Sequence, residues 1–567
     1  MPTLFKTLAK TLEKVEGTKK RTETTTIIAD FLKMLETDEL EPAVNMILGR
    51  PFPKWRQKTL DISWTTLNNV LRRITKADWI TFNEAYSDTG DIGNATKIIF
   101  ENAKLKKQTQ LAKKQLTVIE VRTIIETIAS IIGSGSKERK EHIIETLFSQ
   151  ASPIEAKYLV KIFVGEMRTG FHEGLMEHAI AKAFDVPLLK VQNASMALGE
   201  IGEVAVMART QGKQALSNIR FRVFRPVKPM LAQVASNVEE VLEVHGGETA
   251  FEYKYDGARI QIHKYGSEVR LFSRRLTDVS MSLPEIVETA KTNIIANDVI
   301  LEGEVIAVDS DGFPIPFQHL MRRFKRIHGI ADTTERIPLK LFLFDMLYLN
   351  GENLINLPYM TRRQILLENA GKIFLTKKIV TDKAEIANQF LQEAVKAGHE
   401  GLMAKKPDSK YTPGTRGKRW LKIKTTLEPL DLVITAAEYG YGRRHGWLSD
   451  YHLAARDAET GEFLELGKTF KGLTDAEIVE MTKRLKKLAI RENGWRVTVL
   501  PKIVVEVIYN EIQKSPTYKS EMALRFARIT RIRDDKSTED ADTLQKVRKI
   551  YEKQFSKKGR YKPTHKH

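Results

Sequence analysis

The sequence predicts a multidomain chain, with an all-α first part, an α+β middle part and a small β-barrel towards the C-terminal end. Apolar residues recur at helical spacing up to about residue 220, which predicts helices. Strand patterns alternate with helical ones from there to about residue 425, and short alternating segments follow. A chain of 567 residues is long enough for three or four domains that each bury a core.

The composition narrows the class of protein. Lysine and arginine outnumber aspartate and glutamate by 91 to 72, a net charge of +19, which favours either a polyanionic partner or a solubilising surface. The absence of cysteine excludes disulfides and cysteine-ligated zinc. No apolar run reaches the roughly 20 residues of a membrane span, and no secretory leader pattern opens the chain. We therefore expect an intracellular monomer of the cytoplasm or nucleoid, without a membrane partner.

Two helices of the first part have recognisable starts. Thr117 with Glu120 forms a capping-box pattern, and Ser152 with Glu155 forms another. Dense cations at 104–114 and 137–140 are typical either of solvated helix faces or of contact with phosphate.

The stretch EYKYDGAR at residues 252–259 carries the strongest chemical signal. Its flanks alternate between apolar and polar residues, which predicts a strand, a tight turn at Gly257 and a second strand. Period two places Lys254 on one strand face with Glu252 and Asp256. A lysine held among charged groups suits covalent catalysis, because an unprotonated amine attacks phosphoryl or carbonyl centres. From these residues alone, a hairpin with a solvated lysine is the alternative.

Further motifs follow in a fixed order. Lys-x-Asp-Gly-x-Arg is the nucleophile motif of the covalent nucleotidyltransferases, and five more motifs of that superfamily and a basic run come after it. They are FSRR at 272–275, LEGE at 301–304, LFD at 343–345, EGLMAK at 400–405, WLKIK at 420–424 and the basic run at 525–536. The chain as a whole resembles the ATP-dependent DNA ligases of the archaeal and eukaryotic replicative type. Ordered matches of this kind are far more specific than one short motif.

The resemblance implies a division into domains. We expect an all-α DNA-binding domain at 1–220, an α+β adenylation domain at 221–425, an OB-fold domain at 426–555 and a basic, disordered tail at 556–567. The PVKP segment near residue 226 breaks the helical pattern at the first boundary. The five-stranded barrel of an OB fold fits the alternating segments at 432–437, 451–455, 463–467 and 503–509.

The resemblance also assigns the residues that meet the nucleotide. Lys254 attacks the α-phosphorus of ATP, releases pyrophosphate and leaves a lysyl-AMP phosphoramidate, and we expect nearby cations to lower the pKa of its amine. Glu252 accepts a hydrogen bond from the adenine amino group, which favours ATP over GTP because guanine presents a carbonyl oxygen there. Phe344 stacks on the adenine ring, although its pattern alone would fit a core residue.

The remaining candidates are charged side chains around the ribose, the phosphates and a metal. Arg259 and Arg274 are placed at the ribose and phosphate or at the DNA end. Glu304 and Glu400 are the expected Mg²⁺ ligands, since hard oxygen donors suit that ion; a charged strand face is the alternative for Glu304. The other phosphate-side candidates are Arg416, Lys405, Lys422, Lys424, Arg531 and Lys536. A surface used only for DNA is the alternative for the last two.

The helical part is expected to contact DNA phosphates without reading bases, and the glycine-bearing turn at 165–170 suits this role. In related archaeal ligases a glutamine-led hydrophobic motif docks on a sliding clamp. The corresponding segment at 108–111 lacks the aromatic residues of that motif, so clamp binding stays an open alternative.

The resemblance therefore implies an ATP-dependent DNA ligase that uses ATP and Mg²⁺ to seal nicks in double-stranded DNA during replication, repair and recombination. An RNA ligase or a capping guanylyltransferase shares the lysine motif, but the large helical part and Glu252 count against both. A non-catalytic DNA-binding scaffold is the alternative from another class, and it would need none of the catalytic groups.

Overall fold

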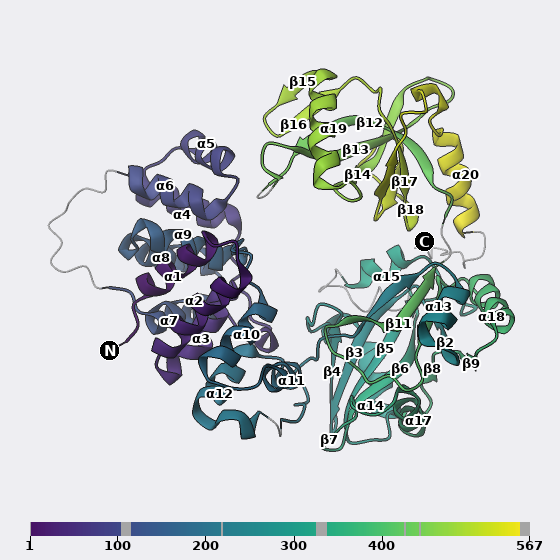
Figure 1. Ribbon diagram of the computed structural model, residues 1–567, viewed down its shortest axis with the longest axis horizontal. Helices are drawn as coiled ribbons and strands as arrows, with labels where there is room; N and C mark the ends of the chain where they lie inside the picture. The colour runs from purple at the N-terminus through teal and green to yellow at the C-terminus, as the bar shows by residue number, and fades with distance from the viewer. Residues whose placement is uncertain are drawn as a thin grey trace.

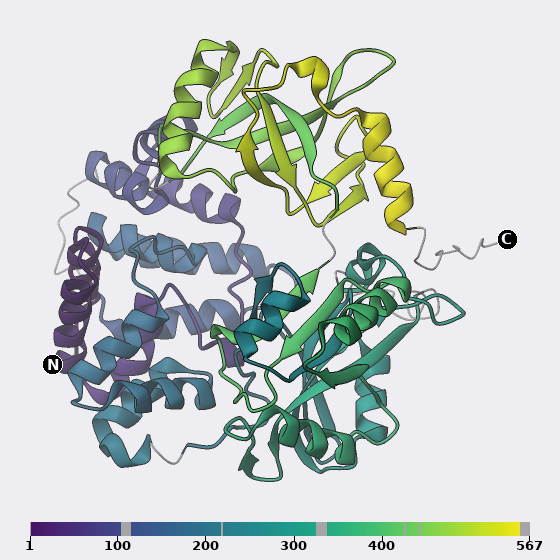
Figure 2. The ribbon, with the colours of Figure 1, turned by 45° about the vertical axis from the view of Figure 1, so that its right-hand side comes forward.

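The chain folds into a helical part, a two-sheet part and a strand-rich part, in that order along the sequence (Figures 1 and 2). The computed structural model describes residues 2–103, 115–216, 219–324, 337–424, 427–441 and 444–555. The candidate clamp segment at 108–111 and the predicted basic tail at 556–567 lie outside these residues. None of the described helices is long and apolar enough to cross a membrane.

The first part is built from helices that share one apolar core. Both predicted capping boxes are present, at Thr117 with Glu120 and at Ser152 with Glu155, so these two helix starts are confirmed. The helices are α1 (Phe5–Glu16), α2 (Arg21–Met34), α3 (Thr37–Ile47), α4 (Trp64–Thr75), α5 (Trp79–Thr89), α6 (Ile92–Asn102), α7 (Val118–Ser130), α8 (Ser136–Gln150), α9 (Pro153–Val164), α10 (Glu173–Ala183), α11 (Leu188–Leu198) and α12 (Ile201–Ala215).

The two-sheet part contains the stretch at 252–259. In the described residues, one sheet has the strand order β1 (Leu231–Ala235), β11 (Arg416–Lys424), β10 (Gly401–Lys405), β2 (Thr249–Lys254) and β9 (Lys378–Thr381). The other has the order β4 (Glu268–Ser273), β3 (Ala258–Tyr265), β5 (Asp298–Ala307), β6 (Leu339–Leu349) and β7 (Glu352–Asn353), with β8 (Phe374–Leu375) beside β6. β4, β5 and β6 lie in the region where the sequence predicted strand patterns that alternate with helical ones.

Helices cover the outer faces of both sheets. α13 (Val238–His245) and α18 (Ala384–Lys396) bury one face of the β2 sheet, with Phe251 of β2, Leu402 of β10 and Ile423 of β11 in the shared core. α14 (Pro284–Asn293), α15 (Phe317–Phe324) and α17 (Tyr359–Asn369) pack on the β3 sheet. The period-two pattern therefore leaves the residues between those core positions on the other face of the β2 sheet.

The strand-rich part has its own core, with strand order β14, β13, β12, β16 and β15, and with β17 between β12 and β20. Its elements are β12 (Leu430–Tyr439), β13 (Leu448–Arg456), β14 (Phe463–Thr469), α19 (Asp475–Lys487), β15 (Ala489–Asn493), β16 (Arg496–Val499), β17 (Val504–Ile508), β18 (Glu511–Lys514), β19 (Met522–Arg525), β20 (Arg528–Ile532) and α20 (Leu544–Phe555). Among these described strands, no pairing joins β14 or β15 to β20, so the sheet does not close into a barrel and the predicted barrel is not confirmed. β18 and β19 form a separate two-stranded sheet.

Each part contacts the other two. Gln57 of the helical part exchanges two hydrogen bonds with the backbone of Leu276 and Asp278, at 2.8 and 2.9 Å. His445 of the strand-rich part bonds to the carbonyl oxygen of Ser87 at 2.7 Å. The guanidinium group of Arg525 lies 4.3 Å from the ring centre of Phe317 on α15.

The helical part encloses a fully buried cation. Lys161 of α9 has no exposed surface, and its ammonium lies 3.2 Å from Glu16 and 3.1 Å from Asp91. Because a buried charge is costly without partners, this cluster ties α9 to α1 and to the start of α6.

We expect Lys161→Ala to destabilise the helical part by about 2–4 kcal/mol, since it leaves the buried Asp91 without its cation, while Glu16 keeps Lys157 at 3.2 Å. The measurement is the midpoint of thermal unfolding followed by circular dichroism. Lys97→Ala is the control, because its pair with Glu13 is partly exposed and such pairs contribute about 1 kcal/mol or less. Equal midpoints for the two variants would contradict the prediction.

Candidate active site

The charged motif residues converge on the face of the β2 sheet that α13 and α18 do not cover, called the open face below. Lys254 on β2 and Lys424 on β11 both pair with Gly401, from opposite sides of β10. Glu252 and Lys422 pair in the same way with the residue two positions along β10. Because cross-strand partners share a face, the four charged side chains point to the same side, as period two predicted for Lys254 and Glu252.

The two strands of the 252–259 stretch do not form a hairpin. β2 belongs to one sheet and β3 to the other, so the chain crosses between the sheets directly after Lys254. Gly257 makes the crossing: a Cβ atom at this position would lie 2.3 Å from the carbonyl oxygen of Val305 on β5. The turn therefore requires glycine, and it brings Lys254 beside Glu304, the neighbour of Val305 on β5.

Lys254 is held in an ion pair. Its Nζ lies 2.6 Å from Oε2 of Glu400, and the Nζ of Lys424 lies 2.8 Å from the same oxygen. Burial acts to lower the pKa of Lys254, but Glu400, Glu304 and Asp256 outweigh it and raise the pKa above the ordinary lysine value. The sequence predicted a pKa lowered by cations, which is wrong for this structure, because a carboxylate is the partner in contact with the amine.

Two other groups have pKa values shifted towards neutrality. Burial raises the pKa of Glu304 to about 7, against the opposing charges of Lys254 and Arg259. Burial lowers the pKa of Lys422 to about 8, and the neighbouring cations Lys424, Lys254, Arg416 and Arg274 lower it further. Perturbed groups that gather in one place are typical of a functional site.

The other end of the face contains Glu252 and Phe344. Glu252 is buried, and it accepts hydrogen bonds from the Tyr359 hydroxyl and from the Lys405 ammonium, the latter at 2.9 Å. The same ammonium lies 4.6 Å from the ring centre of Phe344. Lys405 was predicted among the phosphate-side cations, but the structure places it with Glu252, because it lies two residues beyond Met403, the cross-strand partner of Glu252.

Arg259 lies near Phe344, and its side chain is mostly buried rather than exposed. Its guanidinium group donates to Glu302 at 2.5 Å, to the hydroxyl of Tyr411 at 3.2 Å and to the carbonyl oxygen of Met230 at 2.8 Å. It also lies 5.2 Å from the ring centre of Phe344. No local pattern in the sequence indicates Tyr411 or Tyr359, because both are far along the chain from their partners.

The remaining predicted cations are distributed unevenly. Arg274 and Arg416 are exposed and near enough to influence Lys422. Arg531 is exposed on β20, and Lys536 pairs with Asp431 at 2.7 Å within the strand-rich part. The structure therefore does not bring the last two to Lys254.

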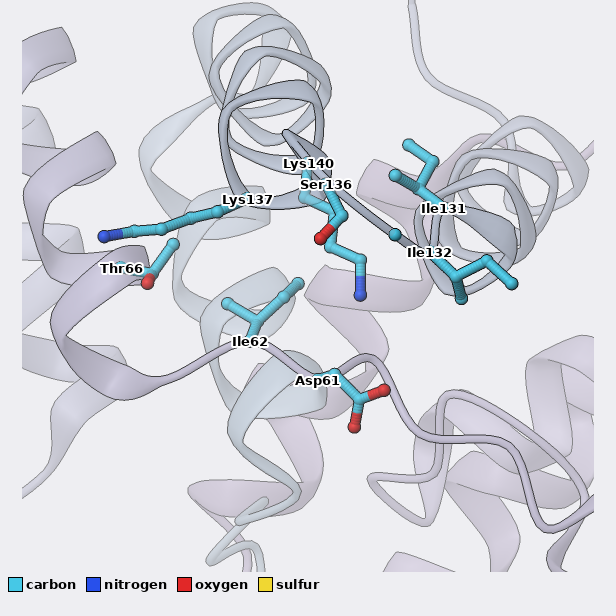
Figure 3. A pocket seen from close by; sticks show the side chains of 9 residues that line it. Asp61, Ile62, Thr66, Ile131, Ile132, Ser136, Lys137 and Lys140 are labelled. Atoms are coloured by element: carbon cyan, nitrogen blue, oxygen red, sulfur yellow. The ribbon is translucent and has the colours of Figure 1, made fainter.

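The helical part has a pocket of about 250 Å³ between the start of α8 and the segment before α4 (Figure 3). Lys140 points towards the segment that carries Asp61 and Ile62, where its ammonium donates to the carbonyl oxygen of Leu60 at 2.8 Å. Lys140 is buried, whereas Lys137 is exposed. The cationic run at 137–140 thus divides into a structural lysine and one that is accessible to a partner.

Comparison with known proteins extends over all three parts. The family model described as ATP dependent DNA ligase domain matches residues 229–424, DNA ligase N terminus matches 4–181, and ATP dependent DNA ligase C terminal region matches 444–536. The chain is 43% identical to DNA ligase of Thermococcus fumicolans over 550 residues, which are 96% of this chain and 98% of that protein.

Two further comparisons agree. DNA ligase 1 of Korarchaeum cryptofilum is 45% identical over 558 residues, 98% of this chain and 99% of that protein. The solved structure titled Pmar-Lig_PreS3 shares the fold with a TM-score of 0.56, covering 93% of this chain and 99% of that chain at 16% identity. Because the likeness to the archaeal enzymes is nearly full-length, the chain belongs to the archaeal-type ATP-dependent DNA ligases.

Proposed function

We propose that this ligase seals nicks in duplex DNA through an AMP group carried on Lys254. The observation that supports this most directly is the position of Lys254. Its amine lies on the open sheet face beside Glu400, with Glu252 two residues away on β2 and with Lys422 and Lys424 on β11, beyond β10. The cations suit the phosphates of ATP, and the Glu252 end suits its base.

The reaction proceeds in three transfers. The Lys254 amine attacks the α-phosphorus of ATP, forming an N–P bond while the bond to pyrophosphate breaks. The AMP then passes to the 5′-phosphate of the nick, which frees the lysine. The 3′-hydroxyl attacks that activated phosphate, forming the phosphodiester bond and releasing AMP. The first attack needs an unprotonated amine, so the ion pair between Lys254 and Glu400 must break before it.

Glu304 and Glu400 are the side chains that we assign to Mg²⁺. In the described part of the chain, no three acidic or histidine side chains gather into a metal site of their own. Two carboxylates fit an ion that keeps several waters and takes phosphate oxygens from its substrate, as Mg²⁺ ordinarily does. Bound there, Mg²⁺ would offset negative charge on the phosphoryl group. Arg259, Arg274, Arg416 and Phe344 complete the proposed nucleotide site.

The proposal extends to the domains. We assign the DNA-binding domain to 1–220, the adenylation domain to 221–425 and an OB-fold domain to 426–555. The apolar core of the helical part and that of the strand-rich part each lie within one assigned domain, which supports this division. Contacts between all three parts suit an enzyme that surrounds a duplex. An RNA ligase, a capping enzyme or an idle scaffold is not favoured, because the full-length relatives are named DNA ligases.

Lys254→Arg is expected to abolish labelling of the protein by α-labelled ATP, because arginine stays protonated and cannot form the adduct. The measurement is labelled protein on a denaturing gel after incubation with Mg²⁺ and without DNA. The wild-type label should be acid-labile, as a phosphoramidate is. A label retained by Lys254→Arg would overturn the assigned nucleophile.

Affinity for ATP is expected to fall with rising pH. The pKa of about 8 means that Lys422 is charged below that pH and neutral above it. Loss of one cation from a phosphate contact should weaken binding roughly 10-fold between pH 7 and pH 9.5. The Kd of ATP is measured in the Lys254→Arg background, which has no chemistry. The double variant with Lys422→Arg should keep its affinity across this range, and an equal fall in both would contradict the prediction.

Binding of nicked duplex is expected to weaken steeply with salt, because phosphate contacts release counterions. Lys137→Gln should reduce the slope of log affinity against log salt by about one unit, for nicks of unrelated sequence alike. Lys33→Gln, which removes an exposed charge from α2, controls for net charge. Equal slopes for the two variants would show that Lys137 makes no specific contact.

A further inference from the structure

Both oxygens of the buried Glu252 carboxylate are occupied by donors from other elements. The Tyr359 hydroxyl, at the start of α17, donates to Oε1, and the Lys405 ammonium donates to Oε2 at 2.9 Å. The three side chains are almost without exposed surface, at 2% for Glu252, 0% for Tyr359 and 1% for Lys405. Burial raises the pKa of Tyr359 well above its ordinary value, so its hydroxyl keeps the proton that it donates.

The helix that carries Tyr359 also supports Phe344. Arg362 forms a two-point ion pair with Asp345, at 2.8 Å to each oxygen, and both side chains are fully buried. Arg363 donates to the carbonyl oxygen of Leu343 at 3.0 Å. The residues on either side of Phe344 are therefore attached to α17, and Tyr359 extends the same support to Glu252 on β2.

We infer that Tyr359 is a positioning residue that sets the choice of nucleotide base by holding Glu252 as an oriented hydrogen-bond acceptor. This inference rests on the proposed contact between Glu252 and the adenine amino group. An ionised carboxylate offers about four acceptor sites, of which Tyr359 and Lys405 take two. The remaining sites can accept from an amino group but repel the carbonyl oxygen of guanine. Without Tyr359, the Glu252 carboxylate is held by Lys405 alone and can turn, so its remaining acceptor sites no longer have a fixed direction towards the base.

The test compares Tyr359→Phe with the wild type in formation of the lysyl-AMP adduct. The probes are ATP, GTP and purine riboside triphosphate, which has no amino group at position 6. The variant should lose roughly 10-fold to 100-fold in kcat/KM for ATP, the range expected when a hydrogen bond to a charged group is lost. Its kcat/KM for purine riboside triphosphate should stay within about 2-fold of the wild type, because that base makes no contact with Glu252. Its preference for ATP over GTP should fall at least 10-fold.

Two controls separate this role from a loss of folding. Tyr359→Phe should seal, at the wild-type rate, a nick whose 5′-phosphate is already joined to purine riboside monophosphate, because that base has no amino group for Glu252 to contact. Tyr451→Phe is the matched variant: Tyr451 is buried in the strand-rich core, and its hydroxyl has no hydrogen-bond partner among the described residues. It should leave every nucleotide preference unchanged.

The outcomes are distinguishable. If the wild type does not prefer ATP to purine riboside triphosphate, the proposed contact between Glu252 and adenine is wrong. If the wild type has that preference and Tyr359→Phe keeps it, the contact stands and the role of Tyr359 is refuted. An equal loss for all three nucleotides would also refute it, because that result indicates a merely structural effect.

Discussion

The ion pair between Lys254 and Glu400 is the constraint on which the rest of the site depends. The backbone fixes it, since the amide of Glu400 donates to the carbonyl oxygen of Lys254 at 2.9 Å. Gly401, next to Glu400, permits this approach: a Cβ atom there would lie 2.2 Å from the carbonyl oxygen of Ile423. The pair favours the protonated amine in the free protein, so Lys254, the proposed nucleophile, is positioned but cannot attack until Glu400 contacts another group.

The rest of the open face carries two groups of charged side chains. One is the cluster of cations around Lys422, and the other is the Glu252 carboxylate with its donors. At the proposed phosphate end, burial lowers the pKa of Lys422, and the surrounding cations lower it further. An anion bound there would offset the repulsion among these cations and raise the pKa of Lys422 again. At the proposed base end, Tyr359 and Lys405 each donate to Glu252, so the carboxylate is held in place before any ligand arrives and keeps acceptor sites for one. The first end is therefore stabilised by an anionic ligand, whereas the second is already oriented in the free protein.

The sequence predicted those parts of the site that depend on short-range pattern. Period two in β2 and β11 was sufficient to place Lys254 with Glu252 and Lys422 with Lys424, because strand neighbours are fixed by pleat alone. It could not predict Tyr359, which lies 107 residues from Glu252, since that contact depends on how α17 packs against β6. The predicted direction of the pKa shift at Lys254 was wrong for a related reason. It depends on which charged group touches the amine, and sequence order does not give that distance.

The cations of the final motif lie in the strand-rich part, away from Lys254, and pair with an acidic residue there. Lys536 and Arg533 share Asp431 at the start of β12, at 2.7 and 3.1 Å. Both pairs are partly exposed, and pairs of that kind contribute little to stability. A phosphate group carries more negative charge than the single carboxylate of Asp431, so it can compete with Asp431 for these cations. The pairing with Asp431 is therefore compatible with the expectation that this motif contacts phosphates, because the same two cations can exchange one anionic partner for another.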